Sequence, residues 1–275
     1  MTIDLKLVDT HCHLTLPDFE GDLDQVLERA FDHGVGKIVV PGIDLESSRK
    51  AVDLAIRFQE VFAAVGVHPN EADRWEPGDA LQLRRLAAHE KVVAIGEIGL
   101  DYYRHRAPPS LQKEALRAQL ELAAELSLPV IVHNRKADDD LMAELRAWRQ
   151  ASGVALRDRA GVLHAFSGTA DFAGRGLALG FFLGLGGPIT YRASAQAREA
   201  AAVVPLEALL LETDAPFLSP HPHRGRRNEP GYVSLVAAKM AEIRGVSTAD
   251  ITRATSQNAA RLFSWDHGNH NRDLH

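Results

Sequence analysis

The sequence predicts a (β/α)8 barrel, in which eight parallel strands alternate with helices. Three observations favour this fold class. Short apolar runs recur eight times, segments with helical spacing lie between them, and the length of 275 residues is close to the roughly 250 residues typical of the fold. A doubly wound open sheet is the alternative, because periodicity alone does not prove that the sheet closes.

The apolar runs are rich in valine, isoleucine and leucine and do not alternate with polar residues. This pattern is typical of strands that are buried on both faces. In chain order the runs are LKLVDTH (5–11), KIVVPGI (37–43), VFAAVGVHP (61–69), VVAIGEIGL (92–100), PVIVHN (129–134), AGVLHAF (160–166), GFFLGLGG (180–187) and ALLLETDAP (208–216).

Helical spacing is clearest in residues 110–127, where Leu116, Leu120 and Ala123 share one face and Ser110 is the expected N-cap. Further helices are expected at 138–150, from a cap at Thr169 to a terminator at Gly180, at 232–243 and at 248–263. The last of these should begin with a capping box formed by Ser247 and Asp250.

Bulk properties exclude several classes of protein. The formal net charge of −6 gives no general attraction to nucleic acid or anionic membranes, so a polyanion needs a local basic patch or metal ions. The single cysteine, Cys12, excludes an intrachain disulfide and fits a reducing compartment. The N-terminus does not resemble a secretory signal, and no apolar run approaches the roughly 20 residues of a transmembrane helix. We expect a cytoplasmic protein with one domain over residues 1–264 and a polar tail over 265–275.

The hexamer VDTHCH (residues 8–13) ends the first run with two histidines separated by one residue. Side chains two positions apart on a strand point to the same side, so His11 and His13 should leave the strand together. Cys12 should then point away from them as a buried, unreactive thiol. Two adjacent imidazoles can hold one metal ion.

Ionisable residues recur near the carboxyl ends of the predicted strands, which in a barrel converge on the face that carries the active site. Buried ionisable groups are costly unless they are paired or bound to metal. The set predicts a metal centre and consists of His11, His13, His68, Glu97, His133, His164 and Asp214.

The number of candidate ligands indicates two divalent ions. The first set is His11, His13, Glu97 and Asp214, and the second is His133 and His164, which need a shared carboxylate. Glu97 lies midway in strand order and is the expected bridge. Mixed imidazole and carboxylate ligands suit Zn, Mn or Co and also allow Mg. Two such ions, about 3.5–4 Å apart, clamp a phosphodiester and lower the pKa of bound water.

Seven motifs in this order resemble the TatD family of metal-dependent deoxyribonucleases, within the amidohydrolase-like metallohydrolase superfamily. The motifs are VDTHCHL, GVHP, GEIGLDYY, PVIVHNR, GVLHAFSG, LLLETDAPFL and HRGRRNEP. Each one alone is weak, whereas the ordered set is specific and covers residues from about Val8 to Phe263. The resemblance implies a barrel fold and hydrolysis of DNA phosphodiester bonds, often from 3′ to 5′ and on single strands. DNA repair is one process that such an activity would serve.

The resemblance also implies roles for individual residues. The metal ligands it implies are His11, His13, Glu97, His133, His164 and Asp214. Asp214 is further implied as the acid–base partner of the attacking water, and His68 matches an active-site histidine, for which we expect contact with a phosphate. The chain departs from the family pattern at Asn134 and Ala165, where serine and cysteine are common. These departures concern substrate preference and not the reaction class.

Several other residues are candidates for substrate contact. Arg224, Arg226 and Arg227 follow the eighth run and could pair with phosphates, the alternative being a solvated surface loop. Bases could stack on some of the aromatic residues beside the motifs, which barrel packing explains equally well: Tyr102, Tyr103, Phe166 and Phe217. We expect Asp101 and Arg135 to orient metal ligands and Arg135 also to reach substrate.

Two alternative functions remain open at this stage. One is hydrolysis of another bond, in an aminoacyl-tRNA ester, a cyclic amide or a lactone. Many such enzymes of the superfamily carry a bridging lysine after the fourth strand, where this chain has Glu97. The other is a binding protein with a structural zinc, which usually needs several cysteines. We expect DNA, and secondarily RNA, as the partner, and a monomer.

Overall fold

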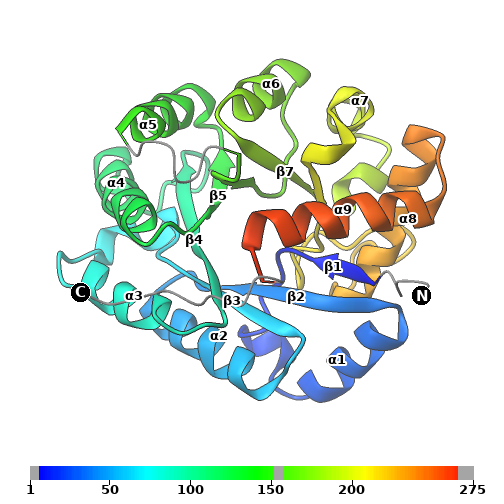
Figure 1. The fold of residues 1–275 in the computed structure, drawn as a ribbon, viewed down its shortest axis with the longest axis horizontal. Helices are drawn as coiled ribbons and strands as arrows, with labels where there is room; N and C mark the ends of the chain where they lie inside the picture. The colour runs from blue at the N-terminus through cyan, green and yellow to red at the C-terminus, as the bar shows by residue number, and fades with distance from the viewer. Residues whose placement is uncertain (1–5, 152–157, 266–275) are drawn as a thin grey trace. The chain divides into compact units, whose positions relative to one another are not determined.

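The computed structural model has the predicted (β/α)8 architecture. It describes residues 6–151 and 158–265. One sheet contains eight strands in the order β1 to β8, so strands that are consecutive in the chain are neighbours in the sheet. The registers of β1 with β2, β3 with β4, β4 with β5, β5 with β6 and β7 with β8 are all parallel. Helices alternate with the strands along the chain (Figure 1).

The strands are three to ten residues long, and each overlaps one of the predicted apolar runs. They are β1 (Leu7–Asp9), β2 (Val35–Pro41), β3 (Val61–Val65), β4 (Val92–Asp101), β5 (Val130–Arg135), β6 (Gly161–Leu163), β7 (Phe181–Leu185) and β8 (Leu209–Leu211). The α-helices among the described residues are α1 (Leu23–Asp32), α2 (Leu45–Arg57), α3 (Asp79–Ala87), α4 (Pro109–Glu125), α5 (Asp138–Ala151), α6 (Ala170–Ala178), α7 (Ala195–Val203), α8 (Val233–Arg244) and α9 (Thr248–Phe263). Short 3-10 helices include η1 (Pro17–Phe19), η2 (Pro69–Arg74) and η3 (Gly187–Thr190).

The chain forms two compact units, each built from several segments. Unit 1 comprises residues up to Val40, 164–177 and 182–259, and unit 2 comprises 41–163, 178–181 and the chain from Ala260. The predicted single domain over 1–264 stays a prediction. Of the predicted polar tail, residues 266–275 lie outside the described residues.

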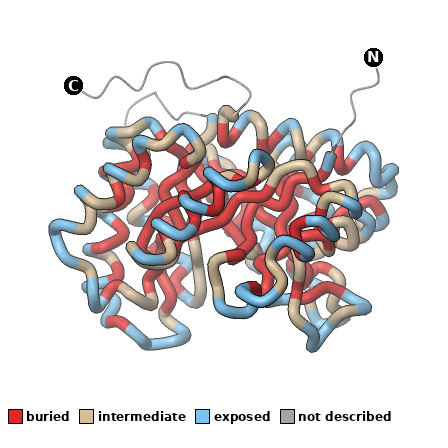
Figure 2. Tube along the Cα trace, turned by 90° about the horizontal axis from the view of Figure 1, so that it is seen from below, coloured by how far each residue is buried: buried red, intermediate tan, exposed pale blue. Residues whose placement is uncertain are grey.

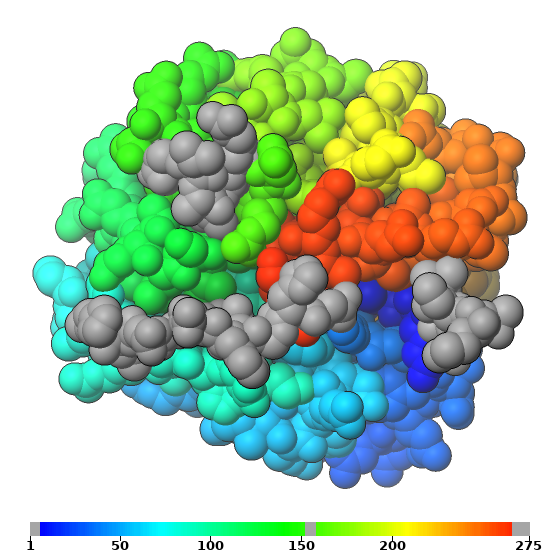
Figure 3. Space-filling view, in the orientation of Figure 1, coloured from blue at the N-terminus to red at the C-terminus, as the bar shows by residue number. Residues whose placement is uncertain are grey.

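Burial follows the pattern expected for strands covered on both faces. Every residue of β4 and of β7 is buried. Along the helices, exposed and buried residues alternate, as Figure 2 shows in pale blue and red. Helix α9 carries exposed residues and lies on the face of the molecule shown in Figure 3. Its Asn258 side chain donates hydrogen bonds to the Leu206 and Leu209 carbonyls, 2.8 Å each. Asn258 therefore anchors the helix.

The predicted helices are present, with most boundaries within about two residues of the prediction. The predicted face of Leu116, Leu120 and Ala123 is buried. The N-cap predicted at Ser110 is wrong, because the helix begins one residue earlier, at Pro109. Proline is favoured at the first helical position, where its missing N–H has no intrahelical partner in any case.

The caps predicted for two later helices are present. Thr169 Oγ1 accepts the Phe172 N–H at 3.1 Å at the start of α6. Ser247 Oγ accepts the Asp250 N–H at 3.1 Å and donates to Asp250 Oδ2 at 2.6 Å at the start of α9. Within the part of the chain that is described, no helix has the length and apolar character that crossing a membrane requires.

Candidate metal centre

The predicted ligands of unit 1 lie together at the ends of three strands. Strand β1 ends at Asp9, so His11 and His13 follow the strand instead of lying in it. Cys12 still makes a parallel bridge with Ala215, and this bridge keeps the two histidines on one side. His164 directly follows β6, and Asp214 comes three residues after β8.

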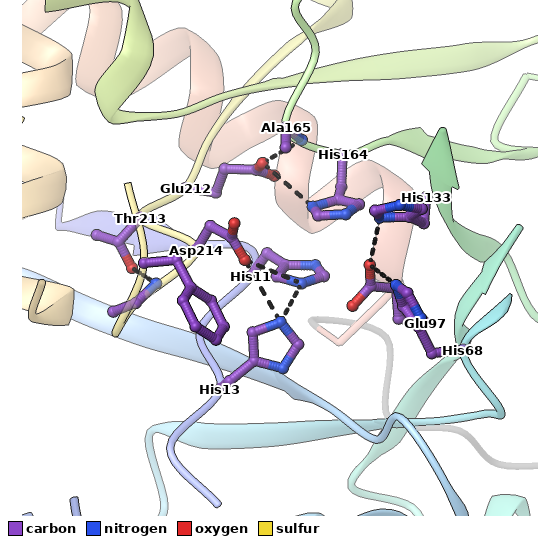
Figure 4. Close-up of polar contacts among 12 residues, drawn as sticks. His11, His13, His68, Glu97, His133, His164, Ala165, Glu212, Thr213 and Asp214 are labelled. Atoms are coloured by element: carbon purple, nitrogen blue, oxygen red, sulfur yellow. Dashed lines mark hydrogen bonds and ion pairs between the residues drawn. The ribbon is translucent and has the colours of Figure 1, made fainter. Parts of the chain in front are cut away.

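Ring nitrogens and carboxylate oxygens converge in this first cluster (Figure 4). The Nε2 atoms of His11 and His13 are 3.1 Å apart. Asp214 Oδ1 lies 3.7 Å from the first and 3.4 Å from the second. The His11 and His164 rings stack at 3.9 Å with an interplanar angle of 8°. One ligand atom each from His11, His164 and Asp214 lies within 4.8 Å of the other two, so one ion could bind all three.

The backbone around Asp214 is held in an uncommon conformation. Asp214 has a φ of 57°, in the left-handed region that few non-glycine residues adopt. Next to it, Thr213 donates its N–H to Asp9 Oδ1 at 2.9 Å and its hydroxyl to Asp9 Oδ2 at 2.6 Å. Asp9 also accepts the His11 N–H at 3.3 Å, so one buried carboxyl ties both ligand segments together. Burial raises the pKa of Asp9 to about 8.

The pKa of Asp214 is lowered although the residue is buried. Burial alone would raise it, but the hydrogen bond from His13 and the nearby His164 and His11 rings outweigh that effect. A lowered pKa keeps this carboxylate ionised at neutral pH.

Glu212 is a member of this cluster that the sequence reading missed. It is fully buried, lies 3.6 Å from His164 Nδ1 through Oε1, and accepts the Ala165 N–H. A side chain at Gly184 would come within 2.1 Å of Glu212 Oε2, so the carboxylate needs this glycine. Its position two residues before Asp214 could have revealed it, because alternate residues of an extended segment face the same side.

The predicted ligands of unit 2, Glu97 and His133, form a second cluster together with His68, for which a phosphate contact was predicted. His133 Nδ1 lies 3.0 Å and His68 Nε2 3.4 Å from Glu97 Oε1, and the two imidazole rings are 4.5 Å apart. Their ligand atoms lie within 4.8 Å of one another, and Figure 4 shows both rings directed at the Glu97 carboxylate. Gly99 lets β4 approach β5 here, because a Cβ on it would lie 2.0 Å from the His133 carbonyl oxygen.

Asp101 contacts this second cluster, as predicted for a residue that orients a ligand. Its Oδ2 lies 3.2 Å from His133 Nε2, while Oδ1 accepts the N–H groups of Tyr103 and Arg104, both at 2.9 Å. Burial opposes ionisation of Asp101, but these hydrogen bonds leave its pKa far below the usual range.

The donor sets of both clusters fit a divalent ion. Each offers imidazole nitrogens and a carboxylate from residues that are buried or nearly so. A buried carboxylate is costly unless a cation or hydrogen bonds compensate it. Nitrogen and oxygen donors together suit Zn, Mn or Co and also allow Mg. Within each unit, the predicted metal ligands therefore lie close enough together to bind an ion.

Cys12 matches its prediction and takes no part in either donor set. It is fully buried, and burial raises the pKa of its thiol well above the usual value. The predicted burial of this thiol is confirmed, and its raised pKa fits the low reactivity that was expected.

The three predicted phosphate-binding arginines differ in their surroundings. Arg227 donates to both oxygens of Asp22 at 2.8 and 2.7 Å, to Glu229 Oε1 at 2.9 Å and to the Asp18 carbonyl at 2.7 Å. Arg224 is exposed and lies over the Tyr191 ring at 4.3 Å, and Arg226 is also exposed. Arg227 is therefore engaged in holding its loop, whereas the other two can approach a ligand.

The candidate aromatic residues also separate into two kinds. Phe166 is buried and stacks on Phe172 at 5.9 Å, which is core packing. Tyr103 and Phe217 are about half exposed, at 56% and 52%. The Arg135 guanidinium lies 4.0 Å above the Tyr103 ring, and the Tyr102 hydroxyl donates to Asp140 Oδ2 at 2.7 Å.

Comparison with known proteins agrees with the motif order. The family described as TatD related DNase matches residues 8–264. The chain is 41% identical over 257 residues to the uncharacterized metal-dependent hydrolase YabD of Bacillus subtilis, covering 94% of this chain and 98% of that protein. It is 38% identical over 263 residues to the 3′-5′ ssDNA/RNA exonuclease TatD of Cronobacter sakazakii, covering 94% and 97%.

A solved structure gives the same result for the fold. The crystal structure of YjjV, a TatD homologue from Escherichia coli, superimposes with a TM-score of 0.88 at 36% identity, over 95% of this chain and 99% of that one. Family match, relatives and fold agree over nearly the whole chain. The chain belongs to the TatD-related DNase family of metal-dependent hydrolases.

Proposed function

We propose that this hydrolase cleaves phosphodiester bonds of single-stranded DNA, removing nucleotides from the 3′ end, and that RNA is a secondary substrate. The observation that carries the proposal is the pair of buried imidazole–carboxylate clusters in or directly after barrel strands. A relative with 38% identity bears the name 3′-5′ ssDNA/RNA exonuclease, which supports the same substrate class.

In this proposal the protein uses two divalent ions. His11, His13, His164 and Asp214 would hold one, and Glu97 and His133 the other. His164 is moved from the second predicted set to the first because its ring stacks on that of His11 at 3.9 Å. Ions so held would act as Lewis acids on the phosphate and lower the pKa of water.

Asp214 is proposed to take the proton of the attacking water. Its lowered pKa makes it an ionised acceptor near neutral pH, and its left-handed backbone directs the carboxylate towards His11 and His13. After attack, the proton on Asp214 is available for the 3′-oxygen that leaves.

His68 is proposed to contact the phosphate. Its Nδ1 accepts the Asn70 N–H at 3.0 Å, so the ring proton belongs on Nε2, the nitrogen that faces the Glu97 carboxylate. That N–H can donate to a phosphate oxygen. Arg224, Arg226, Arg135 and Tyr102 are proposed to bind the rest of the strand, and Arg227 to act indirectly through its loop.

The test uses metal-stripped protein and single-stranded oligonucleotides labelled at the 5′ or the 3′ end. Mg, Mn, Co or Zn is added back one at a time. We expect a ladder that shortens from the 3′ end only when metal is present and that is absent in Asp214→Asn. Glu97→Ala and His133→Ala should also lose activity.

The alternative is hydrolysis of another bond at the same centre. If no ion supports cleavage although the protein binds metal, the phosphodiesterase proposal is wrong. A panel containing an aminoacyl-tRNA, a lactone and a cyclic amide would then identify the reaction.

A further inference from the structure

Two glutamines on helix α4 make an unusual set of contacts in unit 2. Gln112 and Gln119 are almost fully buried, at 1% and 0% exposure. They are seven residues apart, about two helical turns, and therefore lie on the same face. Helix α4 packs against β4 and η2 (Figure 1). A buried carboxamide is costly unless its donors and acceptor are satisfied, so a purely apolar face would be the simpler packing solution.

Gln112 binds the backbone at the end of β4. Its Oε1 accepts the Asp101 N–H at 2.8 Å, and its Nε2 donates to the carbonyl oxygens of Asp101 at 3.0 Å and Ala107 at 2.9 Å. The side chain thus pairs with both backbone groups of Asp101, as a neighbouring strand would. Asp101 is the residue whose carboxylate lies 3.2 Å from His133 Nε2.

Gln119 binds the backbone after β3 in the same way. Its Oε1 accepts the Val67 N–H at 2.7 Å, and its Nε2 donates to the carbonyl oxygens of Val67 and Ala115, both at 3.1 Å. Val67 directly precedes His68, whose ring lies 3.4 Å from Glu97. Gln119 therefore fixes Val67, which is bonded to His68. Gln112 fixes Asp101, which contacts His133.

We infer that Gln112 and Gln119 are positioning residues for the unit 2 metal ligands Glu97 and His133: Gln112 orients His133 through Asp101, and Gln119 acts through Val67 on His68, whose Nε2 lies 3.4 Å from Glu97 Oε1. The inference rests on the part of the proposed function that assigns this cluster to a metal ion, and not on the identity of the substrate. Each amide supplies one acceptor and two donors that no apolar side chain can replace.

The test measures Mn²⁺ binding to the metal-stripped full-length protein by titration calorimetry. Gln112→Met and Gln119→Met keep the length of the side chain and remove the hydrogen bonds. The site is identified by its loss in His133→Ala. We expect the Kd of this site to rise about 10- to 100-fold in both methionine variants, the range seen when groups that orient metal ligands are removed.

Leu116→Ala is the matched control. Leu116 is buried on α4 between the two glutamines, so its truncation destabilises the helix and leaves both carboxamide groups in place. We expect the Tm to fall while the Mn²⁺ affinity stays within about threefold of wild type. Amide exchange separates the two contacts: Gln112→Met should accelerate exchange of the Asp101 N–H, and Gln119→Met that of Val67.

Three results would overturn the inference. Methionine variants that bind Mn²⁺ like wild type would show that the clamps do not position the ligands. If Leu116→Ala loses as much Mn²⁺ affinity as the methionine variants, the effect comes from lower stability of the helix and not from lost positioning of the ligands. A wild-type protein without a Mn²⁺ site at His133 would remove the metal assignment itself. Loss of Mn²⁺ binding in the variants, with no nuclease activity in wild type, would reject only the proposed substrate.

Discussion

Glu212 places a fully buried carboxylate 3.6 Å from the His164 ring, in the same segment after β8 that holds Asp214. It is also the residue of this site that was not predicted. The other site residues stand out because each is a polar interruption within or at the end of an apolar run. Glu212 interrupts the same apolar run as Asp214. Because Asp214 already accounts for a metal ligand at that strand, the sequence gives no separate reason to select Glu212. Only the fold shows that its carboxylate meets His164 and the Ala165 N–H.

This position leads to a prediction for Glu212→Gln. Glutamine keeps an acceptor for the Ala165 N–H but removes the negative charge beside His164. We expect Mn²⁺ affinity at the unit 1 cluster to fall about tenfold, as for other groups behind a metal ligand, with little change in Tm. Calorimetric titration of the metal-stripped protein measures the first quantity and thermal unfolding the second.

Glu212→Leu is the companion variant. It leaves the Ala165 N–H without its partner, which costs about 1–3 kcal/mol, so its Tm should fall clearly. Wild-type Mn²⁺ affinity in Glu212→Gln would show that the charge of this residue does not serve the metal.

At the scale of elements, the positions of strands and helices could be predicted from the sequence, whereas the hydrogen-bond partners of individual side chains could not. Valine-rich runs gave the strands, because burial on both faces leaves no polar alternation. In the sequence, Gln112 and Gln119 look like residues on the exposed polar face of an amphipathic helix. Only the structure shows that they are buried and bind the backbone of Asp101 and Val67. Arg227 likewise resembles a phosphate ligand until Asp22 and Glu229 are seen beside it.

The loop after β8 gives a prediction of pH dependence. Hydrogen bonds from Arg227 lower the pKa of Asp22 from 3.8 to about 2. A depressed folded-state pKa stabilises the protein above the unfolded-state pKa, and this contribution is lost as the pH falls from about 4 to about 2. Because the pair is partly exposed and screened, we expect it to contribute no more than about 1 kcal/mol. Urea unfolding of wild type and Asp22→Asn should differ near neutral pH and converge near pH 2; a constant difference would contradict the assignment.

The same loop gives a prediction for Arg224 and Arg226. Both are exposed, and each phosphate contact to a single strand contributes about −0.7 to the slope of log K against log salt. Arg224→Ala and Arg226→Ala should therefore weaken oligonucleotide binding at low salt and each reduce the slope by about that amount, measured by fluorescence anisotropy. Arg253→Ala, a change to an exposed arginine of α9 that pairs with Asp250, is the control and should leave the slope unchanged. Slopes equal to wild type in both loop variants would place these arginines away from the strand.

For the whole molecule, the fold class and family could be predicted from the sequence because strand ends, motif order and length all point to the same barrel. The assembly of two clusters within two compact units could not, since strand order does not reveal which ligands share an ion. Within unit 1 the ligand atoms of His11, His164 and Asp214 lie close enough to share an ion, and within unit 2 those of His68, Glu97 and His133 do. If each cluster holds one ion, a mutation in one cluster should remove that ion and leave the other bound.

We therefore expect wild-type protein reconstituted with Mn²⁺ to contain two ions per chain, and His164→Ala and His133→Ala to contain one each, measured by elemental analysis after dialysis. Ions that bind only the folded state also stabilise it, by about 2.7 kcal/mol per site at a free concentration of 100 Kd. For a chain of this size this corresponds to roughly 5–10 °C per site, since 1 kcal/mol shifts Tm by about 2–4 °C. Chelation should lower the Tm of wild type by more than that of either variant. Loss of both ions in each single variant would instead mean that the clusters bind metal as one interdependent centre, and an unchanged Tm on chelation would argue against tight metal binding altogether.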